Sequence, residues 1–413
     1  MKILFLTENF PPETNAAATR VYERALYWLR DGHDVTVITS APNFPEGRLF
    51  DGYRNRWRQV EDCDGIRVVR VKTFISRNEG VARRTLDFVS FMFSAVFFGL
   101  FERRPDVISA TSPQFFAAVG GWLLSVIRQR PFVFELGDLW PASIVAVGAM
   151  KPSLPIRMVE KLELFLYRRS AAVAALTHAF RENLVHRGID PAKIRVVRNG
   201  VDGARYGPRP RDAVLAEEWG LKGKFVVGYI GTHGLAHALE NVLYAADLLR
   251  DEPDIVFLFA GAGAARERLM REAETMGLQN VVFMPMQPKE NMPAIWSLCD
   301  VALVHLKNEP TFTEVIPSKI FEAMAMGLPL LFAAPGGEAT EIVSSEQAGC
   351  VVPPENPKAL ADAVLDLRSD EAELGTLANN ALAAAPRYSR ERQAELMIEV
   401  FDAAAEGRQA GEP

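Results

Sequence analysis

Apolar runs of strand length alternate with helical patterns along almost the whole chain, and this feature constrains the fold more than any other. Lys2–Thr7 is predicted to be a buried strand, Ala16–Arg30 a helix and Asp34–Thr39 the next strand. Because parallel strands need crossover connections, the alternation predicts a parallel sheet covered by helices on both faces. Further strands of this first sheet are expected at Ile66–Val71, Asp106–Ala110, Phe132–Leu136, Ala172–Leu176 and Ile194–Val197.

The alternation stops in residues 204–222, which are rich in proline, glycine and charge, and then starts again. This predicts an N-terminal Rossmann-like domain at 1–203, a linker at 204–222, a second Rossmann-like domain at 223–385, and a C-terminal helix and tail at 386–413 that can pack back on the first domain. Two such doubly wound domains in tandem are expected to face each other across a ligand-binding cleft. Strands of the second sheet are expected at Phe225–Tyr229, Ile255–Ala260, Val281–Met284, Val301–His305, Leu330–Ala333 and Cys350–Val352.

Charge is unevenly distributed between the two halves of the chain. The total of −6 divides into +7 over residues 1–203 and −13 over residues 204–413. The first half is therefore the better candidate for facing anionic lipid or a phosphorylated substrate. Three scattered cysteines argue against a disulfide framework and for a reducing compartment, and the six histidines form no zinc motif. The N-terminus, with Glu8 and two prolines after a short apolar run, is not expected to be a signal peptide.

One apolar segment, Leu86–Phe101, contains a single charged residue, Asp87. It is short for a membrane-spanning helix, which needs about 20 residues. Two alternatives remain open: a helix packed under the first sheet, or a partly exposed helix that enters a bilayer surface, with the flanking arginines on lipid phosphates.

The most informative stretch for chemistry is TFTEVIPSKIFEAMAMGLPLL at residues 311–331. Pro317 suits the first turn of a helix, and the unpaired amides and positive dipole of such a turn favour an anion. Glu322 follows among apolar residues, where a carboxylate is costly unless hydrogen bonds satisfy it, as ribose hydroxyls would. Glu314 lies in the preceding loop. The alternative is a surface glutamate and a helix salt bridge between Lys319 and Glu322.

Together with FPPE at 10–13, GHDVTVIT at 32–39, DLWP at 138–141 and RNGVD at 198–202, this stretch resembles the donor-site signature of family 4 retaining glycosyltransferases with the GT-B fold. Within that family the chain is most similar to bacterial enzymes related to the L-fucosamine transferase of O-antigen synthesis, which share the ENFPPE, DLWP and IPSKIFEAM strings. The resemblance covers nearly the whole chain.

The resemblance implies roles for individual residues. Glu322 is expected to bind the ribose of a nucleotide sugar and Glu314, as a catalytic residue, to lie against the transferred sugar. A retaining mechanism without metal or cofactor is also implied. The backbone between the two glutamates is expected to approach the sugar and diphosphate, namely at Val315, Ile316, Pro317 and Ser318.

The chain departs from the family pattern at the diphosphate. Many members carry an Arg and a Lys after the first strand of the second domain, whereas this chain has GTHGLAHALE at 231–240. Lys319 is the candidate for the missing positive charge, with His233 or His237 as alternative hydrogen-bond donors. Gly231 and Thr232 complete the expected donor loop; the alternative is a polar turn that touches no ligand.

Candidate residues in the first half concern the acceptor. Asn15 and Ala16 start a helix with free amides, and Arg20 adds a charge or forms a surface salt bridge. Asp138 is expected to orient or deprotonate the acceptor hydroxyl; the alternative is capping of a helix start near Pro141. Arg198 is a candidate for the cleft.

Two further patterns carry little weight. The D-x-D string at 62–64 precedes Gly65 and is predicted to be a tight turn rather than a metal site. Gly261 and Gly263 resemble half of a dinucleotide loop, which is a weak signal.

The sequence, with the resemblance, therefore predicts a metal-independent hexosyltransferase. The expected reaction moves a sugar from a UDP-linked donor to a polyprenyl-diphosphate-linked saccharide in O-antigen or capsule synthesis. The expected setting is the cytoplasmic side of the plasma membrane, as a peripheral protein on an anionic surface, with no nucleic-acid partner. Two alternatives stay open: a nucleotide-sugar 2-epimerase of similar fold, and a non-catalytic nucleotide-sugar-binding subunit, against which the presence of Glu314, Glu322 and Asp138 argues.

Overall fold

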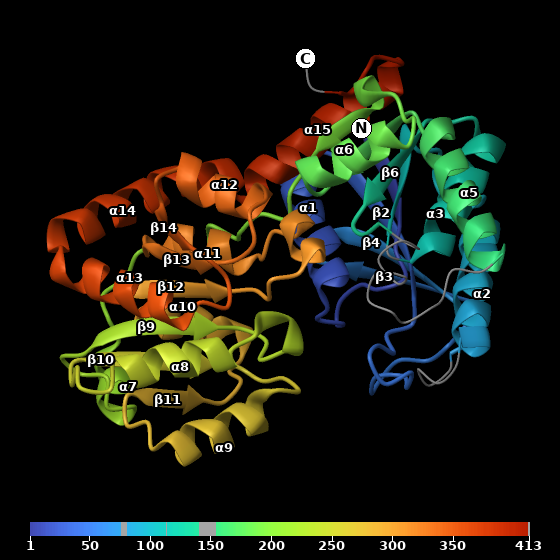
Figure 1. The fold of residues 1–413 in the computed structure, drawn as a ribbon. Helices are drawn as coiled ribbons and strands as arrows, with labels where there is room; N and C mark the ends of the chain where they lie inside the picture. The colour runs from blue at the N-terminus through green and yellow to red at the C-terminus, as the bar shows by residue number, and fades with distance from the viewer. Residues whose placement is uncertain (76–80, 113, 140–153, 412–413) are drawn as a thin grey trace. The chain divides into compact units, whose positions relative to one another are not determined.

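The computed structural model describes residues 1–75, 81–112, 114–139 and 154–411 (Figure 1). The chain forms two compact units, and each is described by itself. Unit 1 comprises Met1–Asn199 together with Arg390–Pro413, and unit 2 comprises Gly200–Ser389. Among the described residues, no helix is long and apolar enough to cross a membrane.

Unit 1 contains an eight-stranded sheet of order β3-β4-β2-β1-β5-β6-β7-β8, in which every neighbouring pair except β3 and β4 is parallel. Its elements are β1 (Lys2–Leu6), α1 (Ala16–Arg30), β2 (Asp34–Ser40), β3 (Arg58–Cys63), β4 (Ile66–Val71), α2 (Val81–Gly99), β5 (Val107–Thr111), α3 (Phe115–Arg128), β6 (Phe132–Leu136), α5 (Leu154–Arg169), β7 (Ala172–Ala175), α6 (His178–His186), η1 (Pro191–Lys193), β8 (Ile194–Val196) and α15 (Arg390–Glu406).

Helices cover both faces of this sheet. Helices α2, α3, α5 and α6 bury their apolar side chains with one face of the strands, and α1 and α15 do so with the other. The C-terminal helix α15 packs on α1: the Trp28 indole donates a hydrogen bond to the Ala394 carbonyl at 3.0 Å and lies edge-on to Phe401. The C-terminal segment thus completes the core of unit 1.

Strand β3 was not expected from the sequence. It pairs antiparallel with β4 at the sheet edge through a turn in which Asp64 and Gly65 have φ values of 54° and 87°, and the Gly65 amide bonds the Asp62 carboxylate at 3.0 Å. The prediction that the D-x-D string forms a tight turn is confirmed.

Unit 2 contains a six-stranded, all-parallel sheet of order β11-β10-β9-β12-β13-β14. Its elements are α7 (Ala213–Glu218), β9 (Phe225–Ile230), η2 (Leu235–His237), α8 (Glu240–Leu248), β10 (Ile255–Ala260), α9 (Arg266–Met276), β11 (Val281–Met284), η3 (Lys289–Asn291), α10 (Met292–Trp296), β12 (Val301–His305), η4 (Pro310–Glu314), α11 (Lys319–Met326), β13 (Leu330–Ala333), α12 (Glu338–Ser345), β14 (Gly349–Val352), α13 (Pro357–Ser369), α14 (Glu371–Ala384) and η5 (Ala385–Tyr388).

The segment 204–222, expected to be a linker, belongs to the core of unit 2. Tyr206, Ala216 and Leu221 are buried in the same apolar cluster as the strands. The chain passes between the units at Asn199–Gly200 and returns at Ser389–Arg390, so these positions differ from the expected boundaries. The prolines and charged residues of this segment led to the prediction of an exposed linker. Its few apolar side chains are nevertheless buried and hold it against the core of unit 2.

Candidate functional site

The strand order of unit 2 determines where a ligand can bind. Chain order reverses between β9 and β12, so the connections after these two strands leave in opposite directions. In sheets of this kind, ligands usually bind at the carboxyl edge beside such a reversal. Strand β9 ends at Ile230 and β12 ends at His305. The loop that begins at Gly231 and the N-terminal end of α11 both lie at this edge.

The Gly231 loop is held by close backbone contact with the loop after β10. The amides of Gly231 and His233 donate hydrogen bonds to the carbonyls of Ala260 and Ala262 at 2.9 and 2.8 Å. A Cβ at Gly261 would lie 2.0 Å from the Gly231 carbonyl oxygen, and one at Gly263 would lie 2.4 Å from the His233 carbonyl oxygen. This glycine pair serves backbone packing, not the dinucleotide loop that the spacing weakly suggested.

His233 and His237, expected to contact the donor, have different surroundings. The His233 ring has no exposed surface and lies among Tyr229, Phe259 and Phe283, so in this structure it does not line an open site. Burial lowers the pKa of His233 and of His237 to about 4, so both rings are neutral near pH 7. Neutral rings can still donate one hydrogen bond but cannot replace a positive charge.

His237 instead joins the two strand ends. Its Nδ1 lies 3.3 Å from the His305 carbonyl oxygen, and Nδ1 of His305 lies 2.7 Å from the His237 carbonyl oxygen. The Lys307 amide adds a bond to the Ala236 carbonyl at 2.9 Å. These bonds fix η2 against the end of β12, and Thr232 remains exposed beside them.

Lys319 is the first residue of α11, and its ammonium points to the Gly231 loop. The Nζ atom lies 3.7 Å from the centre of the Tyr229 ring, and a Cβ at Gly231 would lie 3.0 Å from it. Nζ is buried and has no hydrogen-bond partner among the described residues. Burial lowers the pKa of Lys319 to about 7, although the nearby Glu322 opposes the shift. An ammonium that contacts a ring but has no hydrogen-bond acceptor could hold an anion.

The half-buried Glu322 carboxylate lies one turn further along α11. Side chains of the protein already donate some of the hydrogen bonds that it can accept. The Trp296 indole donates a hydrogen bond to Oε2 at 3.2 Å, and the Tyr206 hydroxyl also bonds the carboxylate. Burial raises the pKa of Glu322, while Trp296, Lys319 and Lys289 act in the opposite direction. Neither Trp296 nor Tyr206 was predicted as a site residue, because both come from distant segments and match no motif.

The loop before α11 carries Glu314, which ends η4 and is half-buried. Its neighbour Thr313 packs against Gly337 at the start of α12, where a Cβ would lie 2.1 Å from the Thr313 carbonyl oxygen. Helix α11 starts at Lys319, two residues later than Pro317, so Pro317 and Ser318 precede the helix instead of forming its first turn. Val315 and Ser318 are exposed, whereas the Ile316 side chain packs against the core.

The candidate acceptor residues lie in unit 1, and Arg20 is not free there. Its guanidinium lies 3.0 Å from Glu135 and donates hydrogen bonds to Thr111 at 2.8 Å and to Asn199 at 3.2 Å. Glu135 also pairs with Arg24 at 2.5 Å. Arg20 is only 6% exposed and belongs to a buried network of polar contacts. It therefore fits neither of the two roles considered for it, a contact with the acceptor or a salt bridge at the surface.

The remaining candidates of unit 1 have structural contacts as well. The Asn15 side chain caps α1 by accepting from the Ala18 amide at 3.0 Å, and the backbone of Ala16 forms the first residue of that helix. The Arg198 amide bonds Gln393 at 2.7 Å. Asp138 is half-buried, with its amide 3.2 Å from the Ser112 hydroxyl; Pro141, at the expected helix start, lies outside the described residues.

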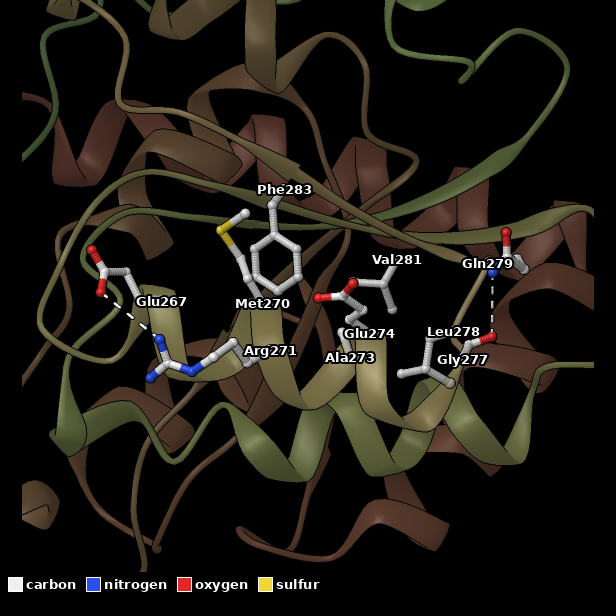
Figure 2. Close-up of a pocket in the computed structure, with 10 residues that line it drawn as sticks. All are labelled: Glu267, Met270, Arg271, Ala273, Glu274, Gly277, Leu278, Gln279, Val281 and Phe283. Carbon is white, nitrogen blue, oxygen red and sulfur yellow. Dashed lines mark hydrogen bonds and ion pairs between the residues drawn. The ribbon is translucent and has the colours of Figure 1, made fainter.

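A separate hollow of about 580 Å³ lies in unit 2 along the edge strand β11 and helix α9 (Figure 2). Figure 2 shows Met270 beside Phe283, with Leu278 further along next to Gly277. None of the predicted site residues lines it. Within the part of the chain that the structure describes, no group of three His, Cys, Asp or Glu side chains is placed to hold a metal ion.

Comparisons with known families agree with this two-unit architecture. Residues 15–200 match the glycosyl transferase 4-like domain, and residues 214–384 match the glycosyl transferases group 1. These matched ranges correspond to most of unit 1 and unit 2 respectively.

Similar proteins are found among curated sequences and solved structures. WcaI of Escherichia coli strain K12, which bears the name of a colanic acid biosynthesis glycosyl transferase, is 27% identical over 79% of this chain and 82% of its own. WbjE of Pseudomonas aeruginosa, named as a glycosyltransferase, is 26% identical over 66% and 68%.

HepE of Anabaena, crystallised with UDP, is 20% identical with a TM-score of 0.71 over 98% of this chain and 100% of its own, a likeness of fold. The chain thus carries the two domains of a known enzyme class in sequence and in fold, and it belongs to the two-domain glycosyltransferases of the GT-B fold that pair a 4-like domain with a group 1 domain.

Proposed function

We propose that the protein is a retaining hexosyltransferase that moves a sugar from a UDP-linked donor, such as an N-acetyl amino sugar, to a polyprenyl-diphosphate-linked saccharide. The observation that carries the donor assignment is the unpartnered, buried ammonium of Lys319 against the Gly231 loop. A diphosphate would supply the anion that this ammonium lacks.

Glu322 supports the same assignment because it lies one turn beyond Lys319 on α11. Its carboxylate is oriented by Trp296 and Tyr206 and keeps acceptor capacity for the two hydroxyls of a ribose. Lys319 and Glu322 would then contact the diphosphate and the ribose of one nucleotide. In the proposal Lys319 takes over the role of the Arg and Lys that the Gly231 loop lacks.

The transfer breaks the bond between the sugar's anomeric carbon and the diphosphate oxygen and forms a bond from that carbon to an acceptor oxygen. The leaving diphosphate gains negative charge, which Lys319 would stabilise. The acceptor hydroxyl loses a proton, for which Asp138 is the proposed base. Glu314, in the loop beside α11, would lie against the sugar and stabilise its positive character in the transition state.

The acceptor and setting rest on sequence and on the names of relatives. The positive charge of residues 1–203 favours a phosphorylated acceptor or an anionic membrane. One relative, WcaI, is named for glycosyl transfer in colanic acid synthesis, which supports a role in cell-surface polysaccharide synthesis, of the O-antigen or capsule kind. We therefore propose a peripheral protein on the cytoplasmic face of the plasma membrane, close in function to the L-fucosamine transferase group.

Calorimetric titration of UDP into the full chain tests the donor site. Lys319→Met and Glu322→Gln should each weaken binding by about 10- to 100-fold, as expected for lost charge-assisted hydrogen bonds. Lys358→Met is the matched control, because Lys358 is exposed on α13 and pairs only with Asp362 among the described residues. Wild-type affinity in both site variants would disprove the assignment.

Product analysis distinguishes transfer from epimerisation. A panel of UDP-sugars with a synthetic polyprenyl-diphosphate saccharide should give a glycosylated lipid with the donor's anomeric configuration, as determined by NMR. Conversion of the donor alone to its 2-epimer would support the epimerase alternative instead, and UDP binding without either product would support a binding subunit.

A further inference from the structure

Three neighbouring helices of unit 1 expose large apolar side chains on one side of its sheet. On α2 and the turn after it, Phe93, Phe97 and Phe101 are 65%, 55% and 68% exposed at a spacing of four residues. On α5, Met158 and Leu162 show the same spacing at 65% and 36%. Equal four-residue spacing gives each helix a continuous apolar stripe, while its opposite face packs into the core.

The stripes belong to one surface because α3 packs beside both helices. The Cβ positions of Gly120 and Gly99 lie against Met92 and Leu124, which brings α3 and α2 into close contact. Helix α3 also contacts α5, and all three lie on the same side of unit 1 (Figure 1). Val126 and Ile127 of α3, 57% and 56% exposed, extend the apolar surface toward α5. We call this surface the α2–α3–α5 face.

A basic hollow of about 640 Å³ opens at the end of this face, between α3 and α5. Trp122, Val126 and Phe165 give it an apolar lining, and Arg130 and Arg169 line it as well. Arg169 lies over the Phe165 ring at 5.6 Å, and Nε of Arg130 is buried without a partner. Among the described residues, neither arginine pairs with a carboxylate.

The charges around the face have one predominant sign. Exposed Arg83, Arg84, Arg157, Lys161 and Arg168 lie on α2 and α5. Of the three carboxylates on these helices, two form ion pairs and the third, Asp87, is half-buried. Glu160 and Glu163 both pair with Arg187, and burial raises the pKa of Asp87 to about 6.

We infer that the α2–α3–α5 face docks on an anionic lipid bilayer, with Phe93, Phe97 and Phe101 among the acyl chains and a lipid phosphate in the Arg130–Arg169 hollow. The exposed aromatic side chains suit the apolar acyl region of a bilayer, and the arginines beside them suit its anionic headgroups. This deepens the proposed function, since it rests on a membrane-borne acceptor, and it assigns the contact to particular side chains.

Sedimentation of the full chain with vesicles tests the inference without donor or acceptor. Wild-type protein should bind vesicles of phosphatidylcholine and phosphatidylglycerol and bind phosphatidylcholine alone weakly. Phe97→Ser/Phe101→Ser should lower binding by at least about tenfold, because two exposed aromatic side chains lose their burial. Arg130→Gln/Arg169→Gln should lower it by about fivefold per arginine, only with the anionic vesicles.

Controls separate docking from misfolding and from general surface effects. Val214→Ser and Lys222→Gln change one exposed apolar and one exposed basic residue of unit 2 and should bind as wild type does. Phe93→Ser is a milder second variant if the double phenylalanine change lowers thermal stability. Vesicle binding that is unchanged in all face variants would overturn the inference.

Two further measurements distinguish membrane docking from self-association and from effects on the donor site. A wild-type dimer that dissociates in Phe97→Ser/Phe101→Ser, seen by analytical ultracentrifugation, would assign the face to a second copy of the chain and overturn the inference. UDP titration of the same variants should match wild type. If the wild-type protein does not bind UDP, the proposed function is wrong, but the result on membrane docking still holds.

Discussion

The indole nitrogen of Trp296 donates a hydrogen bond to Oε2 of Glu322 across 3.2 Å and so fixes the carboxylate on α11. The bond comes from the end of α10, a different segment of unit 2, and it opposes the rise in pKa that burial imposes on Glu322. Trp296 therefore positions the Glu322 carboxylate, the proposed partner of the ribose, and favours its ionised form.

Replacing Trp296 with phenylalanine should separate this effect from packing. We expect Trp296→Phe to raise the donor KM by about five- to tenfold, the equivalent of about 1 kcal/mol for one lost hydrogen bond, with little change in kcat. The pKa of Glu322 should rise, so donor affinity on acidification should start to fall at a higher pH than in wild type. Trp219→Phe makes the same change elsewhere in unit 2 and should leave the pH profile unmoved.

Lys319 should give the apoprotein a measurable stability penalty. Burial lowers its pKa to about 7, so between pH 7 and about 10 the unfolded chain binds more protons, and the free energy of unfolding should rise with pH. Lys319→Met should remove this slope. It should also stabilise the apoprotein near pH 7 by up to about 4 kcal/mol, the upper value found when buried ion pairs are replaced by apolar residues.

The same lysine predicts a pH dependence of donor binding. Because the ammonium of the free protein loses its proton as pH rises through about 7, UDP affinity should fall as the pH is raised above about 7. Lys319→Arg keeps its charge over this range and should flatten the profile, whereas Lys319→Met should bind weakly throughout. Calorimetry at several pH values measures both; a flat wild-type profile would contradict a role for the Lys319 proton.

The strands were predictable because most carry buried, continuous apolar runs. Phe225–Ile230 and Val301–His305 match the expected ranges within one residue. Strand Arg58–Cys63 was missed since it lies at the edge, where exposed and half-buried residues alternate and no apolar run forms. Local sequence thus predicts the interior of a sheet better than its margin.

Site residues were predictable only where they lie together on one segment of the chain. Lys319 and Glu322 both lie on α11, so a single sequence motif was enough to predict both as site residues. The partners of Glu322 could not be anticipated, because Tyr206 and Trp296 approach only when the fold is complete. His233 shows the opposite failure: its position in the donor loop suggested a ligand contact, but the ring turns into an aromatic core.

The buried pairing of Glu135 with Arg20 and Arg24 should be essential to unit 1. Burial favours the protonated acid, but the two guanidinium groups outweigh this and lower the pKa of Glu135. Glu135→Gln leaves two buried cations without a counter-ion and should cost about 3–5 kcal/mol of unfolding free energy. Glu391→Gln breaks only the exposed pair with Arg30 and should cost about 1 kcal/mol or less in guanidinium unfolding. Equal losses would show that the Glu135 network is no more than a surface pair.

Two adjacent glycines offer a matched test of Glu314. A Cβ at Gly337 would lie 2.1 Å from the Thr313 carbonyl oxygen, whereas one at Gly336 meets no atom within 4 Å. Gly337→Ala must therefore displace the η4 loop and carry Glu314 with it, since that residue follows Thr313 directly. A displacement of about 1 Å at a reacting group can cost about 100-fold, so we expect kcat to fall by 10- to 100-fold while UDP affinity holds. Gly336→Ala should change kcat by less than about twofold, as surface substitutions commonly do. If both variants turn over as wild type does, the position of Glu314 does not control the transfer, and the role proposed for that carboxylate is wrong.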